Sequence, residues 1–300
     1  MFFAFSPKTT FQDINMRLLS AVAAAALMLT NAAFADDITG TLKKIKDTGI
    51  IKLGFLPESV PFSFVDVDGS PLGYSVDLCK RVATGIQEQL GLQKLDVQWV
   101  PVTLETRFDA IKSGKIDLEC GITTNSLSRQ KQVDFSVMTW VDGANFAVRD
   151  GSPVRSLADL AGKKIAVIPG TTTETVLKDA LAKSYINAEV VRVHSHVEGL
   201  QQIYKGEVDA YSTDQVVLLG LAVGVSPTMK IKIGERNFSY EPYGLMMRRN
   251  DADFRQAVNT VLSRIYRSGQ ITQIYDRWLG KLGKPSDFVI VMYLLNGLPE

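Results

Sequence analysis

The sequence predicts an α/β fold in which central sheets are flanked by helices on both faces. Short apolar runs alternate with amphipathic segments of helical period along most of the chain. The alternation occurs twice, over about residues 50–138 and again over about residues 164–223. Repeated strand–helix alternation is typical of sheets covered by helices. Two such series in one chain of 300 residues favour two lobes.

In the first series, a strand is expected at residues 50–55 and a long helix at 74–90. Apolar residues alternate with polar ones over 95–99, as in a half-buried strand. The remaining elements are a helix at 105–112 and strands at 116–120 and 133–138. The apolar side chains that share one face of the long helix are Val76, Cys79, Val82, Ala83 and Ile86.

In the second series, Ser156 is expected to cap a short helix ahead of an apolar strand at 164–168. Asp251 is expected to cap a long helix near the end of the chain. The apolar stretch 288–295 is expected to pack on the body of the protein. Between these points the pattern predicts helices at 172–183, 196–205 and 214–223, strands at 188–193, 208–212 and 243–248, and a last helix through 274–278.

The first 35 residues have the pattern of a secretory signal peptide. Arg17 precedes an almost wholly apolar run over 18–29, and Ala33-Phe34-Ala35 offers the small residues of a cleavage site. We expect cleavage after Ala35, with Met1 or Met16 as the start, and a periplasmic location. The alternative is an uncleaved anchor, but the run is shorter than the ~20 residues that a span requires.

The composition argues against several classes of function. A net charge of +1 provides no strong field toward nucleic acid or anionic membrane. Two Cys and two His, none in ligand spacing, make a structural zinc site improbable, and the pair His194 and His196 has no further ligand nearby. No nucleophilic triad or spaced carboxylate pair is visible. We expect no metal, no cofactor and no enzymatic activity.

Cys79 and Cys120 allow two interpretations. An oxidising compartment would permit a disulfide between them. They could equally be two buried apolar thiols, because sequence does not show whether their Cα atoms come close enough.

Three segments carry polar groups that suit a zwitterionic ligand. Arg129 follows Thr124 by five residues, after a strand that ends near Gly121, and a guanidinium grips a carboxylate through two parallel hydrogen bonds. Taken alone, Arg129 could instead form a surface ion pair. Thr171 and Thr172 begin a helix, where unpaired N–H groups attract anions, although an ordinary Thr cap would look the same. Asp214 follows a buried strand and could hold an ammonium group, or simply cap the next helix.

Read together, these segments resemble the periplasmic amino-acid-binding proteins of ABC transporters, the family 3 solute-binding proteins. The resemblance spans about residues 39–278 and depends on an ordered set of segments. The nearest branch is similar to the glutamate/aspartate-binding proteins, through Cys120-Gly121-Ile122-Thr123-Thr124-Asn125 and His196. The other segments of the set are Ser59-Val60-Pro61-Phe62-Ser63-Phe64, Gly73-Tyr74-Ser75-Val76-Asp77-Leu78, the continuation to Arg129, Gly170-Thr171-Thr172 and the Asp214 strand end.

The resemblance implies a two-lobed type II periplasmic-binding-protein fold whose lobes are joined by two crossing strands. Lobe 1 would comprise residues 39–141 and 239–300, and lobe 2 residues 142–238, with the ligand in the cleft between them. It also implies roles for the site residues. Arg129 and Thr124 would hold the α-carboxylate with Thr171 and Thr172, while Asp214 and the carbonyl group of Ile122 would hold the α-ammonium group.

The selectivity positions depart from the family pattern. Leu56 stands where relatives carry a charge chosen for the ligand, and Leu104 makes a cleft-wall position apolar. Ile122 replaces a hydroxyl residue that is usual in this branch. Arg107 and His196 match side-chain contacts of the acidic-ligand branch and remain. The combination favours an acidic or polar amino acid.

The resemblance also implies permease subunits of an inner-membrane ABC transporter as partners of a monomeric protein. Two other interpretations stay open. One is a periplasmic dehydratase-like enzyme of the same fold that uses Glu174 or Glu58 as its acid. The other is a sensory module that reports the ligand to a receptor.

Overall fold

The computed structural model describes residues 38–224 and 230–299. The expected signal peptide lies outside these residues. Residues 39–300 form one compact unit, which contains two five-stranded sheets and one small three-stranded sheet. No helix within the described part of the chain is long and apolar enough to cross a membrane.

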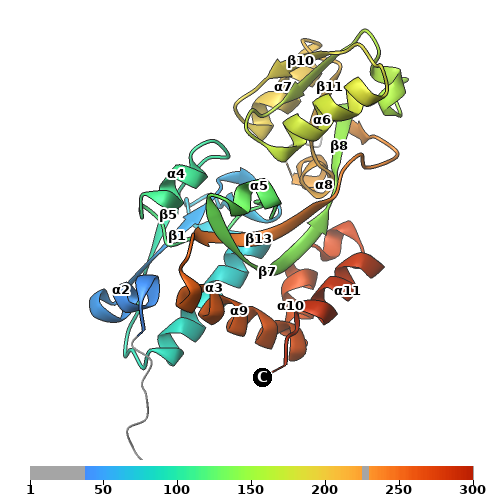
Figure 1. The fold of residues 1–300 in the computed structure, drawn as a ribbon. Coiled ribbons are helices and arrows are strands. Elements are labelled where there is room, and N and C mark those ends of the chain that lie inside the picture. The colour runs from blue at the N-terminus through green and yellow to red at the C-terminus, as the bar shows by residue number, and fades with distance from the viewer. Residues whose placement is uncertain (1–37, 225–229, 300) are drawn as a thin grey trace, which may run out of the picture. The chain divides into compact units, whose positions relative to one another are not determined.

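The first sheet is mixed and carries most of the N-terminal series. β5, β1 and β6 run parallel, while β13 pairs antiparallel with both β6 and β7. Figure 1 shows β7 and β13 running side by side although about a hundred residues separate them. In sheet order, the strands are β5 (Asp96–Pro101), β1 (Ile50–Phe55), β6 (Leu118–Glu119), β13 (Glu241–Arg248) and β7 (Val133–Asp142).

The second sheet is built from the stretch of chain between β7 and β13. It packs an apolar cluster that includes Phe146, Ile165 and Leu177, because strands covered on both faces bury nearly every side chain. Its strands, in sheet order, are β10 (Glu189–Arg192), β9 (Lys164–Val167), β11 (Ala210–Asp214), β8 (Ala144–Arg149) and β12 (Ile231–Ile233). The small third sheet consists of β2 (Glu58–Ser59), β3 (Ser63–Val65) and β4 (Pro71–Leu72).

Helices pack against both large sheets. Those of the first and last parts of the chain include α3, α9 and α10, which contact one another. The helices are α2 (Gly40–Thr48), α3 (Tyr74–Gln89), α4 (Arg107–Lys112), α5 (Leu127–Gln130), α6 (Thr172–Lys183), α7 (His196–Lys205), α8 (Gln215–Gly224), α9 (Ala252–Arg267), α10 (Gln270–Trp278) and α11 (Asp287–Asn296), with 3₁₀ turns at Leu157–Leu160 and Gly280–Leu282.

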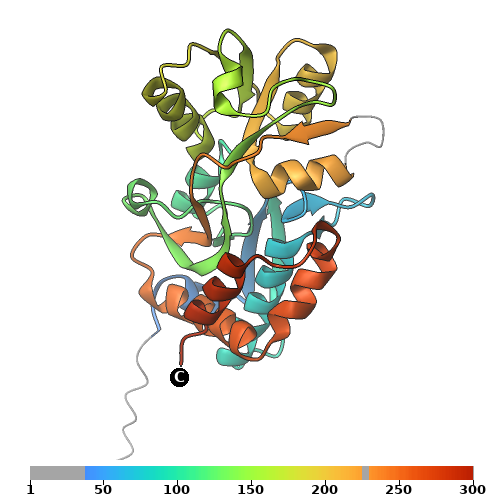
Figure 2. The ribbon, with the colours of Figure 1, turned by 90° about the vertical axis from the view of Figure 1, so that its right-hand side faces the viewer.

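The C-terminal apolar stretch forms α11, which packs against β7 and α9 (Figure 2). Only Val289, Met292 and Asn296 of this helix are buried, whereas Phe288 and Leu294 remain 79% and 76% exposed. The expectation that this stretch packs on the body is therefore confirmed, and its other side chains stay exposed because a single helix turns only one stripe of side chains inward.

A disulfide joins Cys79 of α3 to Cys120 at the end of β6, with the Cα atoms 6.1 Å apart. The interpretation as two separate buried thiols is thereby excluded. The bond ties the start of the 121–124 turn to a helix of the first sheet. This turn carries Thr124, one of the expected site residues.

Candidate functional site

Arg129 lies inside the protein rather than on its surface. It belongs to the short helix α5, which Ser126 caps by accepting a hydrogen bond from the Arg129 N–H group. The side chain is only 8% exposed, its Nη1 donates to the carbonyl oxygen of Thr124 at 3.1 Å, and its guanidinium lies over the Phe108 ring. Burial lowers its pKa, opposed by the negative charge of Glu241. The alternative of a surface ion pair is therefore wrong.

The helix α6 begins beside this arginine. Thr171 is its N-cap, since its hydroxyl oxygen accepts from the Glu174 N–H group at 3.1 Å and the hydroxyl itself donates to the carbonyl of Ile168. Thr171 thus acts as the ordinary cap that the sequence also allowed. The next residue, Thr172, directs its hydroxyl elsewhere.

Glu241, at the start of β13, brings the two threonine segments together. Its Oε2 accepts hydrogen bonds from the hydroxyl groups of Thr124 at 2.7 Å and Thr172 at 2.8 Å. Its Oε1 accepts from Ser239 at 2.8 Å. The Glu241 side chain is 1% exposed. Glu241 could not be identified from the sequence, because a single Glu ahead of a strand carries no signal of which distant hydroxyl groups it meets.

Asp214 ends β11 and faces the same group of residues. Its Oδ1 accepts from the Thr173 hydroxyl at 3.1 Å and its Oδ2 from the Tyr243 hydroxyl at 2.5 Å. Burial, reinforced by the negative charge of Glu241, raises its pKa to about 6. The alternative in which Asp214 caps the next helix is not what the structure shows, because the N–H group of Val216 donates to Asp142.

Arg107 and Glu119 are two buried groups of opposite charge that interact electrostatically, without a hydrogen bond between them. Arg107 is 2% exposed and Glu119 0%, and the Nη1 of Arg107 donates to the carbonyl of Leu104. Burial and the neighbouring charge of Arg129 lower the pKa of Arg107 to about 10, while burial raises that of Glu119 against the opposing charge of Arg107. The positive charge expected to select an acidic ligand is therefore opposed from within the protein.

His196 is buried at the start of α7 and is held by two hydroxyl groups. Its Nδ1 lies 2.7 Å from the Tyr211 hydroxyl and its Nε2 lies 3.4 Å from that of Ser59. Burial, with the nearby charge of Arg107, lowers its pKa to about 4, so the imidazole is neutral at pH 7. His194 instead contacts Glu105 at 3.2 Å, and no group of metal-ligating side chains occurs within the described residues.

A cavity of about 130 Å³ lies between the segment 56–59 that follows β1, the segment 102–104 and the start of α7. Leu56, Leu104 and His196 share its wall, whereas Ile122 is buried within the 121–124 turn and does not line the cavity. Five of the lining residues are apolar, and the polar ones are Glu58, Ser59, Thr103, Ser195 and the two histidines. Its lining residues are Leu56, Pro57, Glu58, Ser59, Val102, Thr103, Leu104, Ile168, His194, Ser195 and His196.

The structure thus assembles two neighbouring groups from the expected residues. Arg129, Thr124, Thr172 and Asp214 converge through Glu241 and Tyr243 into a polar centre. Leu56, Leu104 and His196 line the cavity. Sequence reasoning missed the residues that connect them, namely Glu119, Thr173, Tyr211, Glu241 and Tyr243.

The chain is similar to known proteins over most of its length. A model of the bacterial extracellular solute-binding proteins, family 3, matches residues 51–281. The chain is 37% identical to the L-glutamate/L-aspartate-binding protein of Pseudomonas aeruginosa over 262 residues, which cover 87% of this chain and 86% of that protein. It is 30% identical to the glutamate/aspartate import solute-binding protein of Escherichia coli over 263 residues, 86% of this chain and 87% of that protein.

The solved structure of an ancestral arginine-binding protein bound to glutamine matches with a TM-score of 0.69 at 32% identity, over 77% of this chain and 98% of the other. A periplasmic binding protein from Brucella ovis with glutathione bound matches with a TM-score of 0.71 at 26% identity, over 83% and 77%. The predicted fold class, α/β of the two-lobed type II kind, is confirmed by these similarities.

Proposed function

Because the chain belongs to family 3 of the bacterial extracellular solute-binding proteins, we propose that it binds a free amino acid and delivers it to the permease of an ABC importer. The observation that carries this proposal is the convergence of Thr124 and Thr172 on one carboxylate oxygen of Glu241. These hydrogen bonds to the protein's own carboxylate support a carboxylate-binding role for the two hydroxyl groups, with the buried Arg129 near them.

In our proposal, the ligand's α-carboxylate binds to Arg129 and to the hydroxyl groups of Thr124 and Thr172. Charge-assisted hydrogen bonds of this kind are among the strong polar contacts in proteins. Thr171 contributes at most its backbone, because its hydroxyl is already used within the helix start. Glu241 must turn away from the two threonine hydroxyl groups, or share them, when a ligand arrives.

The α-ammonium group binds to Asp214, aided by the carbonyl oxygen of Ile122. Asp214 is buried and held in place by Thr173 and Tyr243, so little side-chain entropy remains to be lost on binding. The fixed carboxylate of Asp214 is therefore a favourable partner for the ligand's ammonium group.

The residues proposed to bind the α-carboxylate and the residue proposed to bind the α-ammonium group belong to different parts of the fold. A ligand that contacts both parts therefore favours closure of the two lobes around it. We propose residues 39–141 and 239–300 as lobe 1 and residues 142–238 as lobe 2, joined where β7 continues into β8 and where the chain returns to β13. A zwitterion that contacts both lobes stabilises the closed state over the open one, which is the condition for a ligand-driven hinge motion.

The ligand's side chain extends into the cavity lined by Leu56, Leu104 and His196. Its volume of about 130 Å³ fits a side chain of a few heavy atoms. The guanidinium of Arg107 places a positive charge near this cavity, but the negative charge of Glu119 offsets it and His196 is neutral. We propose an acidic or polar side chain, with an uncharged amide among the candidates that suit this balance.

We propose that the protein binds its ligand without catalysing a reaction. A dehydratase-like mechanism requires a carboxylic acid that keeps its proton at neutral pH. The Lys178 ammonium group lowers the pKa of Glu174, and Glu58 is exposed to solvent. Neither candidate acid therefore has the environment that such catalysis needs. We further propose export by the N-terminal signal, cleavage after Ala35, and a monomeric state in the periplasm.

Isothermal titration of the purified protein against the twenty amino acids tests the proposal. We expect one or a few ligands to bind, and Arg129→Ala to weaken each of them by about a hundredfold, because removing one partner of a buried charge pair costs about 2–5 kcal/mol. Arg192→Ala, which changes an exposed arginine of an ion pair, is the matched control. Equal binding by Arg129→Ala and wild-type protein would contradict the assignment, as would release of a chemically altered product.

A further inference from the structure

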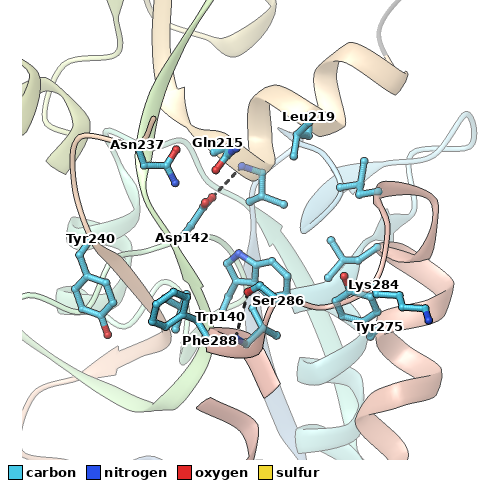
Figure 3. Close-up of a pocket in the computed structure, with 15 residues that line it drawn as sticks. Trp140, Asp142, Gln215, Leu219, Asn237, Tyr240, Tyr275, Lys284, Ser286 and Phe288 are labelled. Atoms are coloured by element: carbon cyan, nitrogen blue, oxygen red, sulfur yellow. Dashed lines mark hydrogen bonds between the residues drawn. The ribbon is translucent and has the colours of Figure 1, made fainter. Parts of the chain in front are cut away.

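A second, larger cavity lies beside the crossing strands and apart from the amino-acid site. Its volume is about 470 Å³, within the range of pockets that hold small organic molecules. It shares no lining residue with the smaller cavity described above. Figure 3 shows its walls, which come from the end of β7, the start of α8, the return segment at 237–240, and the chain from α10 to α11.

Trp140, which lines this cavity, has a buried polar atom without a partner. Trp140 is 7% exposed, and its indole Nε1 finds no acceptor among the described residues. The ring itself is fixed, since it stacks on Tyr275 with the centroids 6.1 Å apart and meets Phe62 edge-on. A buried N–H group without an acceptor costs roughly 1–3 kcal/mol. An acceptor supplied by a ligand would recover this free energy.

The remaining walls define the kind of molecule that fits. Polar side chains lie toward the crossing strands, where Figure 3 shows Asp142, Gln215 and Asn237 near one another. Apolar side chains cover the rest of the cavity: Val216, Leu219, Leu279, Leu282, Phe288 and Val289.

The two charged residues that line the cavity do not favour a charged ligand over a neutral one. Asp142 is the acidic residue of the lining and Lys284 the basic one. Asp142 is already engaged by the N–H group of Val216 at 3.0 Å, and burial raises its pKa well above the ordinary value, which lessens its negative charge. Lys284 is exposed to solvent. A ligand therefore gains most from an apolar body and a single neutral acceptor.

We propose that this cavity is a binding site for a small uncharged amphipathic molecule, with an aromatic or alicyclic body and a carbonyl or hydroxyl oxygen that accepts the hydrogen bond of Trp140 Nε1. The body packs between Leu219 and Phe288. The site shares no lining residue with the smaller cavity, and five of its fifteen lining residues lie at 282–289, beyond the matched family range, which ends at residue 281.

The neutral fluorophore prodan, a naphthalene that carries a propionyl carbonyl group, is a suitable probe because its emission shifts to the blue in apolar surroundings. We expect saturable binding to the wild-type protein. Trp140→Phe keeps an aromatic side chain but removes the N–H donor, and should raise the dissociation constant about three- to tenfold, the value of one hydrogen bond. Leu219→Trp should fill the cavity and abolish binding.

Leu294→Ser is the matched control, because Leu294 is exposed on the outer face of α11 and does not line the cavity. It should leave prodan binding unchanged. Circular dichroism melting verifies that each variant is folded. Wild-type affinity in both Trp140→Phe and Leu219→Trp, or loss of binding in Leu294→Ser, would overturn the proposal. Neither readout depends on amino-acid binding, so the proposed transport function is tested separately.

Discussion

The hydroxyl oxygens of Thr124 and Thr172 lie 3.2 Å apart, although one follows a strand of the first sheet and the other begins a helix over the second. Both are within hydrogen-bonding distance of the same oxygen of Glu241. The polar centre of the site is therefore held together by a carboxylate on one of the two strands that lead between the sheets.

We expect amino-acid binding to depend on pH near 6, because Asp214 is the proposed partner of the ligand's ammonium group. The pKa of Asp214 is about 6, and only the ionised form attracts an ammonium group. Affinity should therefore fall as the pH drops through 6, by about tenfold between pH 7 and pH 5. Titration calorimetry at half-unit intervals measures this profile, and a flat profile over the interval contradicts the role of Asp214.

Glu241→Gln should move that midpoint to lower pH. The negative charge of Glu241 is one cause of the raised pKa of Asp214, and glutamine removes the charge while it keeps an acceptor for the threonine hydroxyl groups. The control is Glu235→Gln, which changes an exposed carboxylate on the same return segment. An unmoved midpoint in Glu241→Gln would mean that the two carboxylates do not interact.

Glu119→Gln should shift ligand preference toward acidic amino acids. Replacing the carboxylate leaves the charge of Arg107 unopposed, and a side-chain carboxylate of the ligand then becomes its partner. We expect the ratio of glutamate to glutamine affinity to rise about tenfold, which corresponds to about 1.4 kcal/mol. Competition titrations measure the ratio, with Glu88→Gln on the exposed side of α3 as the control. An unchanged ratio removes Glu119 from the account of selectivity.

Gly220→Ala should weaken binding without touching the ligand. A Cβ atom at Gly220 of α8 would lie 2.4 Å from the carbonyl oxygen of Val60 and 2.8 Å from Pro61 Cδ, so helix and loop must separate. We expect about tenfold weaker binding and a larger radius of gyration of the ligand-bound protein in small-angle X-ray scattering. Gly280→Ala, where the added atom would meet Asp276 only at 3.9 Å, should change neither quantity. Wild-type values in Gly220→Ala would show that this contact does not limit closure.

The disulfide should contribute substantially to stability. The bonded cysteines are 41 positions apart in sequence, and the chain-entropy relation gives about 4 kcal/mol for a loop of that length. The double variant Cys79→Ala/Cys120→Ala should lose about this much free energy of unfolding in a urea titration. Wild-type protein reduced with dithiothreitol should show a similar loss. Overlapping curves for oxidised and reduced protein would refute the expectation.

Local signals in the sequence were sufficient for much of the fold. The helices α6 and α7 begin and end where the sequence predicted, because Thr171 and Ser195 cap them. The strand β8 was missed, and β7 was expected to end at 138 rather than at Asp142. The chain there runs as two successive strands that pair in different sheets, and the length of such strands is fixed by their distant partners.

The same distinction applies to the site. Arg129, Thr124 and Asp214 could be named because each follows a recognisable strand end or helix start. Glu241 and Tyr243 could not, since their importance depends on hydrogen bonds to residues far away in the sequence. The roles of all five in ligand binding stay predictions that the measurements above address.

The chain leaves the first sheet for the second after Asp142 and returns to it at Glu241, and these two residues are paired opposite each other. Residues 143–240 therefore form an insertion between two neighbouring strands, and its ends already lie side by side. Such a segment can be exchanged as a unit: a chimera that takes these residues from a relative would carry that relative's counterparts of Thr172 and Asp214 while it keeps Arg129. Swapping a single stretch of chain is thus a direct route to hybrid receptors for new ligands.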